Sequence, residues 1–338
     1  MIQLFSLFRS QSQTETILFG VFALVILVFL LLDLGLFNKE PKAIDTRSAL
    51  KQSIFWVSVS TVFGILVYFF DERGADGSLE YFSAYLTEYA LSVDNIFVIL
   101  LILKYFSVKE EYYHKILFWG ILGALVFRGV FIFVGALLVA KFHWILYLFG
   151  AFLVYSGIKI YFNDQEDEMD PGTNPILKLC KRWLPVSHDD GGGQFTLREN
   201  GKLMFTPLFL VVVLIETTDL VFAVDSIPAA FAISQSEFII YTSNIFAVLG
   251  LRAMFFLLSG VIDRFYLLQK GLSIILFFIG AKMLVELGAG RLPDWLVHLH
   301  PGISFGFIIL TLALSIIFSV IIPEVREQKE LEEKSGEE

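Results

Sequence analysis

The stretch EYALSVDNIFV, residues 88–98, places a glutamate, an aspartate and an asparagine inside a largely apolar run of sequence. The run extends from Leu79 to Leu103, and a helix needs about 20 residues to cross a bilayer. A second stretch of the same kind, DLVFAVDSIPA, begins at Asp219. The two stretches share a Val-Asp-polar-Ile core, which indicates that one acidic membrane helix occurs twice in the chain.

The composition is that of a polytopic membrane protein. Apolar residues make up 56% of the chain and charged residues 17%, with a mean hydropathy of +0.72, whereas soluble domains are about 45–50% apolar and about 25% charged. The single cysteine excludes an intramolecular disulfide and a cysteine-based metal cluster. Apolar runs predict nine transmembrane helices, at 16–37, 50–70, 79–103, 115–140, 143–162, 203–233, 237–260, 269–289 and 302–322. We interpret the first of these as a retained helix and not as a signal peptide.

Basic residues are unevenly distributed over the predicted connections. Eighteen of the 25 lysines and arginines fall in alternate connections and the C-terminal tail, whereas four fall in the other connections. Because basic residues accumulate on the cytoplasmic side, we expect the N-terminus outside the membrane and the C-terminus in the cytoplasm. The longest cytoplasmic connection is 163–202, and Asn200-Gly201 within it predicts a β-hairpin.

The two acidic stretches belong to longer repeats. Glu88 corresponds to Asp219 and Asp94 to Asp225; downstream, GILGALVFRGV matches NIFAVLGLRAM, and GIKIY matches GAKML. Each unit holds three helices, and an odd number inverts the second unit relative to the first. The predicted fold is therefore an all-α integral membrane protein with two inverted three-helix repeats, spans 3–5 and 6–8, an arrangement typical of secondary transporters. The predicted division is two N-terminal helices (1–78), the first repeat (79–162), a cytoplasmic loop (163–202), the second repeat (203–290), the ninth helix (291–322) and a charged cytoplasmic tail (323–338).

Spans 3 and 6 carry more acids than the membrane region has bases. A charge at the bilayer centre costs roughly 2.5–3.5 kcal/mol, so intramembrane acids indicate function. The acids are Glu88, Asp94, Glu216, Asp219 and Asp225. Arg128 and Arg252 lie at membrane depth as counterion or gating candidates. Even if both arginines are paired, three negative charges remain, to be protonated, bridged to Lys282 or offset by a bound cation.

Helical geometry separates these acids into two faces. At about 100° per residue, one face holds the following side chains: Glu88, Ser92 and Asn95 in span 3, and Glu216, Asp219 and Ser226 in span 6. Asp94 and Asp225 point about 120° away on an unbroken helix. Pro228 predicts a kink or opening at 224–227, which would free carbonyl oxygens beside Asp225. By symmetry we expect a matching break at 94–96.

The predicted ligands are oxygen atoms of carboxylate, amide, hydroxyl and carbonyl groups, which suit Mg, Ca or Mn. The metal-site candidates are Glu88, Asp94, Asn95, Glu216, Asp219 and Asp225, and the secondary candidates are Ser92, Ser226, Asn244 and Lys282. An alternative is that the acids form fixed ion pairs with both arginines and only specify helix packing.

The motifs EYALSVDNIFV, LIETTDLVFAVDSIPA, FWGILGALVFRG and TSNIFAVLGLRA resemble those of the TerC family of bacterial membrane proteins, named for tellurium resistance. The resemblance extends from LDLGLF, at Leu32, through the ninth span. It implies an inner-membrane protein whose relatives include manganese exporters, some induced by alkaline pH and some linked to supplying metal to exported proteins. It also implies that the six metal-site candidates named above form the transport site.

These observations favour export of a divalent cation, with manganese taken from the resemblance and protons as the exchanged ion. We expect no catalytic residues and no bound cofactor, the metal being the substrate, and as partners the metal cation, protons and the lipid bilayer, without nucleic acid. One alternative is an intramembrane aspartyl protease, which also uses nine spans and two aspartates. It predicts a GxGD turn, where this chain has AVDS and SVDN. Another is a membrane scaffold in a tellurite or metal stress-response or secretion complex, acting through the 163–202 loop.

Overall fold

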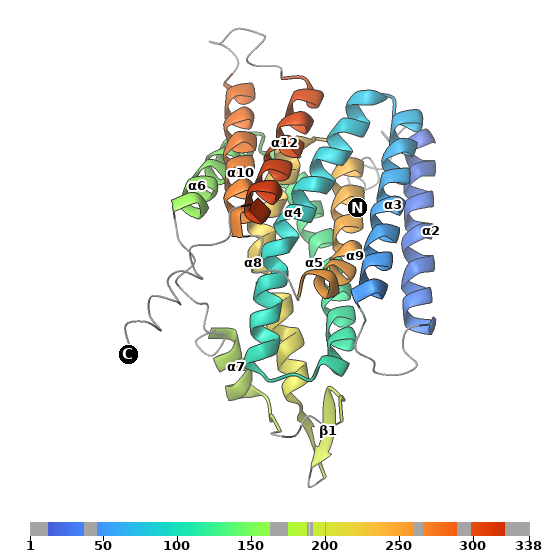
Figure 1. Ribbon diagram of the computed structural model, residues 1–338, viewed down its shortest axis with the longest axis vertical. Helices are drawn as coiled ribbons and strands as arrows, with labels where there is room; N and C mark the ends of the chain where they lie inside the picture. Colours follow the sequence, from blue (N-terminus) through green and yellow to red (C-terminus); the bar gives the residue numbers. More distant parts are fainter. Residues whose placement is uncertain are drawn as a thin grey trace.

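The computed structural model is a bundle of long helices (Figure 1). It describes residues 13–36, 46–162, 175–187, 189, 192–199, 201–259, 266–288 and 299–321. The helices are α2 (Gln13–Leu36), α3 (Thr46–Phe70), α4 (Ala75–Tyr105), α5 (Tyr113–Lys141), α6 (Ile145–Phe162), α7 (Pro175–Trp183), α8 (Pro207–Ile233), α9 (Glu237–Leu258), α10 (Tyr266–Leu287) and α12 (Pro301–Ile321). A short 3₁₀ turn, Glu110–Tyr112, precedes α5.

Eight helices in the described ranges are long and apolar enough to cross a membrane, namely α3, α4, α5, α6, α8, α9, α10 and α12. An all-helical integral membrane protein is therefore confirmed. The helix α2 coincides with the first predicted span, and its segment 17–28 is apolar but shorter than a full crossing. The count of nine stays a prediction.

The element between α6 and α8 is partly a small β-hairpin. Strands β1 (Thr196–Glu199) and β2 (Lys202–Phe205) pair antiparallel, and Gly201 between them has a φ of +79°, a conformation that favours glycine. The predicted hairpin is confirmed. The prediction that the sixth span begins at 203 is wrong, because β2 continues to Phe205 and Pro207 opens the helix. The acidic stretch 163–174 and Asn200 lie outside the described residues.

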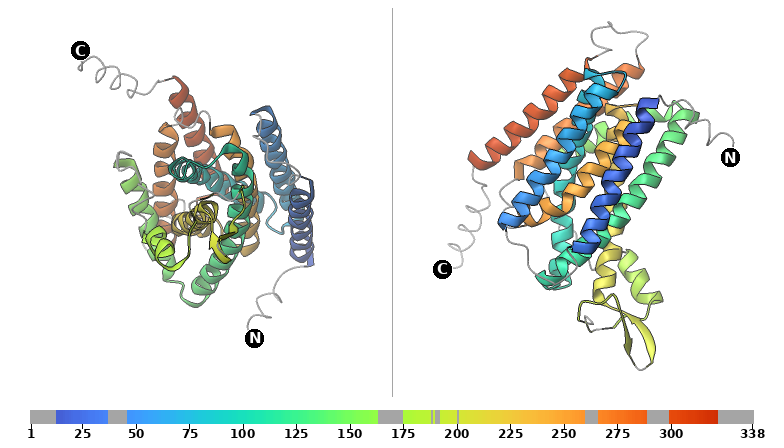
Figure 2. Two further views of the ribbon diagram at one scale, coloured as in Figure 1. Left: turned by 90° about the horizontal axis from the view of Figure 1, so that it is seen from below. Right: turned by 90° about the vertical axis from the view of Figure 1, so that its right-hand side faces the viewer.

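The helices of the two predicted repeats interlock. Helix α6 packs along α10, α4 packs on α9, and α5 packs on α8. Helix α8 leaves the hairpin end of the bundle, where α4 finishes, so the two run in opposite directions (Figure 1). This packing is consistent with an inverted relationship, which itself stays a prediction. Helices α2 and α3 lie along one side of the bundle (Figure 2). Helix α9 is enclosed by other helices, and 89% of its most apolar 18-residue segment is buried.

Helices α4 and α8 are unbroken through their aspartates. The predicted opening at 224–227 and its counterpart at 94–96 are not seen, although Pro228 lies inside α8. A proline in a helix interior costs about 3 kcal/mol. The residues that follow it, among them Ala230 and Phe231, are buried against α6 and α10, and burial of one large apolar side chain stabilises by about 1.5–3 kcal/mol. Packing of the last turn therefore offsets much of the proline's cost.

Candidate functional site

Arg128 of α5 lies where four helices meet. Its side chain is 1% exposed, and its Nη1 donates to Glu88 of α4 and, at 2.9 Å, to Oδ1 of Asn244 of α9. Its Nη2 and Nε donate to the two carboxylate oxygens of Asp219 of α8, at 3.0 and 3.3 Å. One guanidinium thus holds together Glu88 and Asp219, the two acids that correspond in the predicted repeats.

The cluster carries more negative than positive charge. Glu88 and Asp219 are 2% and 9% exposed, and among the described residues Arg128 is the base that bridges them. Charges in a low-dielectric interior are weakly screened, so an unbalanced carboxylate is costly. The arrangement therefore attracts a proton or a cation.

A small cavity lies beside Asp219. Its volume is about 20 Å³, enough for one water-sized species, and it is lined by Asn95, Ile99, Leu117, Gly120, Ile121, Ala124, Ile215, Thr218, Asp219, Phe222 and Leu251. Asn95 donates from Nδ2 to Oδ1 of Asp219 at 3.4 Å. Carboxylate, amide and hydroxyl oxygens in this lining are the hard ligands that Mg, Ca and Mn prefer.

Glu216 lies one helical turn before Asp219 and faces α5. Its Oε2 is buried without a hydrogen-bond partner among the described residues. A Cβ atom built at Gly123 would lie 2.0 Å from its Oε1, so the missing side chain at Gly123 creates the space for this carboxylate. The neighbour of Gly123 is therefore an acidic side chain of the candidate site.

Two of the predicted acids and the lysine lie elsewhere. Asp225 accepts a hydrogen bond from Oγ of Ser156 of α6 at 2.8 Å. Asp94 is half-buried and has no hydrogen bond or ion pair within the described ranges. Both positions follow from the unbroken helices, which turn these aspartates away from Arg128. Lys282 does not bridge the acids, because it pairs with Glu286, one turn further along α10, at 3.5 Å.

The remaining candidates have mixed positions. Asn244 is in the cluster, and its Nδ2 is buried without a partner among the described residues. Ser92 donates to the backbone oxygen of Glu88 at 2.8 Å, which is an intrahelical bond. The hydroxyl of Ser226 is buried without a described partner. Arg252 is buried, 9% exposed, and is not part of the Arg128 cluster.

Within the part of the chain that the structure describes, no three His, Cys, Asp or Glu side chains are grouped to hold a metal ion. In this arrangement Arg128 occupies the position between the two corresponding acids. The role of the candidates as metal ligands stays a prediction.

Three contributors were missed from sequence. Thr218 lines the cavity, Gly123 leaves space for the side chain of Glu216, and Ser156 donates a hydrogen bond to Asp225. Ser156 directly precedes the repeated GIKIY segment, which was a usable signal. The other two positions depend on how α5 and α8 face one another, and periodicity does not specify this.

The chain is similar to proteins of several bacteria. It is 39% identical over 304 residues to "Uncharacterized membrane protein STKORF319" of Myxococcus xanthus, covering 90% of this chain and 92% of the relative. It is 41% identical over 311 residues to "Putative membrane-bound redox modulator Alx" of Photorhabdus laumondii, covering 90% and 94%, and 40% identical over 306 residues to the protein of the same name of Escherichia coli K12, covering 88% and 94%. No solved structure is significantly similar. The family described as "Integral membrane protein TerC family" matches residues 73–327, and this chain belongs to that family.

Proposed function

We propose that this protein is a secondary transporter, and not an enzyme, that exports a divalent metal cation, with Mn²⁺ as the first candidate, across the bacterial inner membrane. The observation that carries the proposal is the sharing of Arg128 by Glu88 and Asp219, which come from two helices of opposite direction. Polar residues at the interface of two such units are the usual location of a transported ion.

Arg128 acts as an internal counterion in this proposal. Its guanidinium stabilises the two acids when no metal is bound, and a divalent cation that enters beside Asp219 competes with it for the same oxygens. The cavity lined by Asn95 and Thr218 supplies the first space for such an ion. When the hydrogen bonds between Arg128 and Asp219 break, both oxygens of the Asp219 carboxylate become available to the cation.

Proton exchange follows from the surplus of acid. Glu216 has a buried oxygen without a described partner, one turn from Asp219. Protonation of such a carboxylate removes the repulsion between neighbouring acids and weakens metal binding. Protons that bind from the outside and leave towards the cytoplasm would drive metal outward.

Two other functions have less support. An aspartyl protease needs two aspartates that share a proton. Asp225 instead accepts a hydrogen bond from Ser156, and the described residues show no hydrogen bond between Asp225 and Asp94. The names of some relatives refer to redox modulation. A single cysteine, Cys180, cannot form an intramolecular disulfide, so an internal dithiol pair does not support such a role here.

Metal uptake into everted membrane vesicles tests the proposal. In wild-type vesicles we expect ⁵⁴Mn²⁺ uptake driven by a pH gradient with the acidic side inside the vesicle. The uptake rate should fall by at least about tenfold in Glu88→Gln and in Asp219→Asn, since each change removes a ligand that must be charged. Glu237→Gln, a half-buried acid at the start of α9, is the matched control and should transport normally. Wild-type rates in Asp219→Asn would refute the proposal.

A second measurement separates binding from transport. Mn²⁺ should raise the melting temperature of the wild-type protein in detergent, because a ligand that binds only the folded state stabilises it. Mg²⁺ and Ca²⁺ in parallel identify which cation is preferred.

The proposed orientation has the N-terminus outside and the C-terminus in the cytoplasm, supported by the distribution of lysines and arginines. A cysteine placed in the 323–338 tail should react with a membrane-impermeant maleimide only in everted vesicles.

A further inference from the structure

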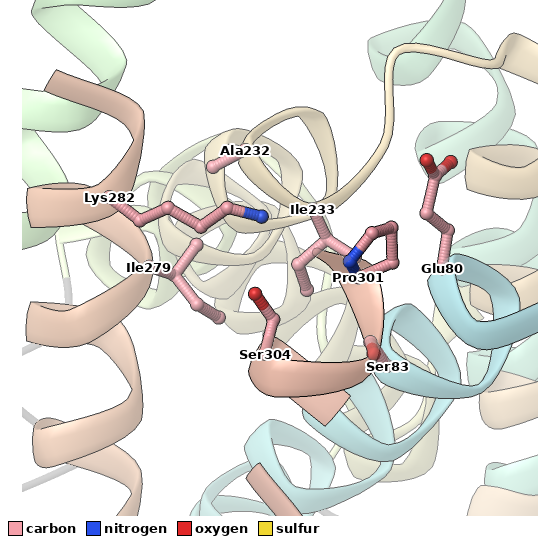
Figure 3. A pocket seen from close by; sticks show the side chains of 8 residues that line it. All are labelled: Glu80, Ser83, Ala232, Ile233, Ile279, Lys282, Pro301 and Ser304. Carbon is pink, nitrogen blue, oxygen red and sulfur yellow. The ribbon is translucent and has the colours of Figure 1, made fainter. Parts of the chain in front are cut away.

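A second pocket lies on helices α4, α8, α10 and α12 and shares no residue with the Arg128 cluster. It is found at the end of the bundle where α4 and α12 begin and α8 finishes, and it is lined by Glu80, Ser83, Ala232, Ile233, Ile279, Lys282, Pro301 and Ser304 (Figure 3). Its volume is about 10 Å³, at the lower limit of the space that one water-sized species needs.

The pocket contains hydrogen-bond donors that have no described acceptor. The hydroxyls of Ser83 and Ser304 are buried, their residues 1% and 6% exposed, and neither has a partner among the described residues. A buried polar group left unpaired costs about 1–3 kcal/mol. Figure 3 shows the Ser304 hydroxyl directed towards the side of the pocket where Lys282 lies.

Lys282 adds a positive charge to this group. Its side chain is 10% exposed, and its one described partner is Glu286, 35% exposed, at 3.5 Å. An i,i+4 pair of this kind contributes only about 0.2–0.5 kcal/mol. The ammonium carries three donors, and Figure 3 shows its nitrogen directed towards Ile233, another residue of the pocket lining.

The carboxylate in the lining is already engaged. Glu80 accepts from Arg73 at 2.8 Å and from Ser234 at 2.6 Å, and its oxygens point away from Lys282 (Figure 3). Burial of the Arg73 guanidinium acts to lower its pKa, but Asp71 and Glu80 outweigh this effect and raise the pKa above its ordinary value. Arg73 is therefore a permanent cation that is shared by Glu80 and Asp71.

The start of α12 adds few free donors. Pro301 has no N–H, and the N–H groups of Gly302 and Ile303 donate to Nδ1 and the carbonyl oxygen of His300, at 3.0 and 2.8 Å. Lys282 and the two serine hydroxyls are therefore the groups that present surplus donors to one small occupant.

We propose that this pocket binds a halide-sized monovalent anion, chloride under physiological conditions, held by Lys282, Ser83 and Ser304. The bound anion satisfies the buried hydroxyls and ties α4, α10 and α12 together. This site shares no residue with the Arg128 cluster, so it stands or falls independently of metal transport.

Thermal unfolding in detergent tests the site. At equal ionic strength, we expect the melting temperature of the wild-type protein to be about 2 °C or more higher in sodium chloride or bromide than in sodium gluconate. Lys282→Gln and Ser304→Ala should lose this difference, and Lys282→Arg should retain it because the charge is kept.

The controls are matched in helix and residue type. Lys270→Gln changes a lysine near the other end of α10, and Ser315→Ala removes a buried hydroxyl of α12 that bonds its own helix at 2.8 Å. Both should keep the halide effect. Crystals grown in bromide should show one anomalous peak between Lys282 and Ser304. No halide effect in the wild type, or an unchanged effect in Lys282→Gln, would overturn the proposal and leave the pocket as a water site.

Discussion

Arg128 donates two hydrogen bonds to Asp219 across the contact between α5 and α8, from Nη2 to Oδ1 at 3.0 Å and from Nε to Oδ2 at 3.3 Å. A planar guanidinium matches a carboxylate in this way, whereas a lysine ammonium is a point charge that cannot. The same guanidinium also holds Glu88, so its removal affects two buried acids at once.

Arg128→Gln should therefore change stability and metal affinity in opposite directions. Without metal, the loss of a buried ion-pair partner should destabilise the protein by about 3–5 kcal/mol. With metal, the two acids no longer have an internal competitor, so the rise in melting temperature caused by Mn²⁺ should be larger than in the wild type. Melting curves with and without MnCl₂ measure both effects. A smaller Mn²⁺ effect in Arg128→Gln would contradict the role of an internal counterion.

Gly123→Ala should disturb Glu216. The new Cβ would lie 2.0 Å from Oε1 of Glu216, so the carboxylate must move, with a cost of about 1–3 kcal/mol. We expect reduced Mn²⁺ uptake in vesicles and a lower melting temperature. Gly129→Ala, on the same helix with nothing within 4 Å of the new Cβ, is the control and should change stability by less than about 0.5 kcal/mol.

A double variant shows whether the effect passes through Glu216. In Gly123→Ala with Glu216→Ala the clashing side chain is gone, so the stability should recover although transport stays low. Failure of the double variant to recover stability would mean that Gly123 matters for another contact.

Ser156→Ala should act through Asp225. The hydroxyl donates to Oδ1 at 2.8 Å, and a hydrogen bond to a charged group contributes about 1.5–3 kcal/mol. We expect slower Mn²⁺ uptake in Ser156→Ala, and no additional effect of this change in an Asp225→Asn background. Additive effects in a double-mutant cycle would show that the two residues act separately.

Pro228→Ala tests whether α8 opens during transport. The replacement restores an N–H donor towards the carbonyl of Val224, so the melting temperature should rise. If opening beside Asp225 belongs to another step of the cycle, uptake should slow at the same time. Faster or unchanged uptake would show that the proline has no such role.

The sequence predicted the membrane helices well, and it predicted the contacts inside the candidate site less well. Helix α9 was expected at 237–260 and is found at Glu237–Leu258, because long apolar runs are a strong signal. The meeting of Glu88, Asn95 and Asp219 agrees with the 100° face. The proposed openings failed because a local rule for Pro228 did not include the packing of Phe231 and its neighbours.

The sequence did not predict which basic side chain pairs with which acidic one. Lys282 lies within its span like Arg128, but nearer one end of its helix, and it belongs to a different pocket. Which base meets which acid depends on the rotation of α10 and α5 about their axes, and helices that are apolar on all sides carry little information about rotation. The separation of Asp225 from the cluster follows once the helix is known to be continuous.

The guanidinium between Glu88 and Asp219 also has an electrical consequence. An elementary charge that crosses the full membrane potential exchanges about 2.3 kcal/mol per 100 mV, and the arginine cancels one of the two charges that an unloaded carrier would otherwise move. The return of the metal-free protein should thus still move one net charge, and neutralising Arg128 should make this return more strongly voltage-dependent in proteoliposomes with an imposed potassium diffusion potential.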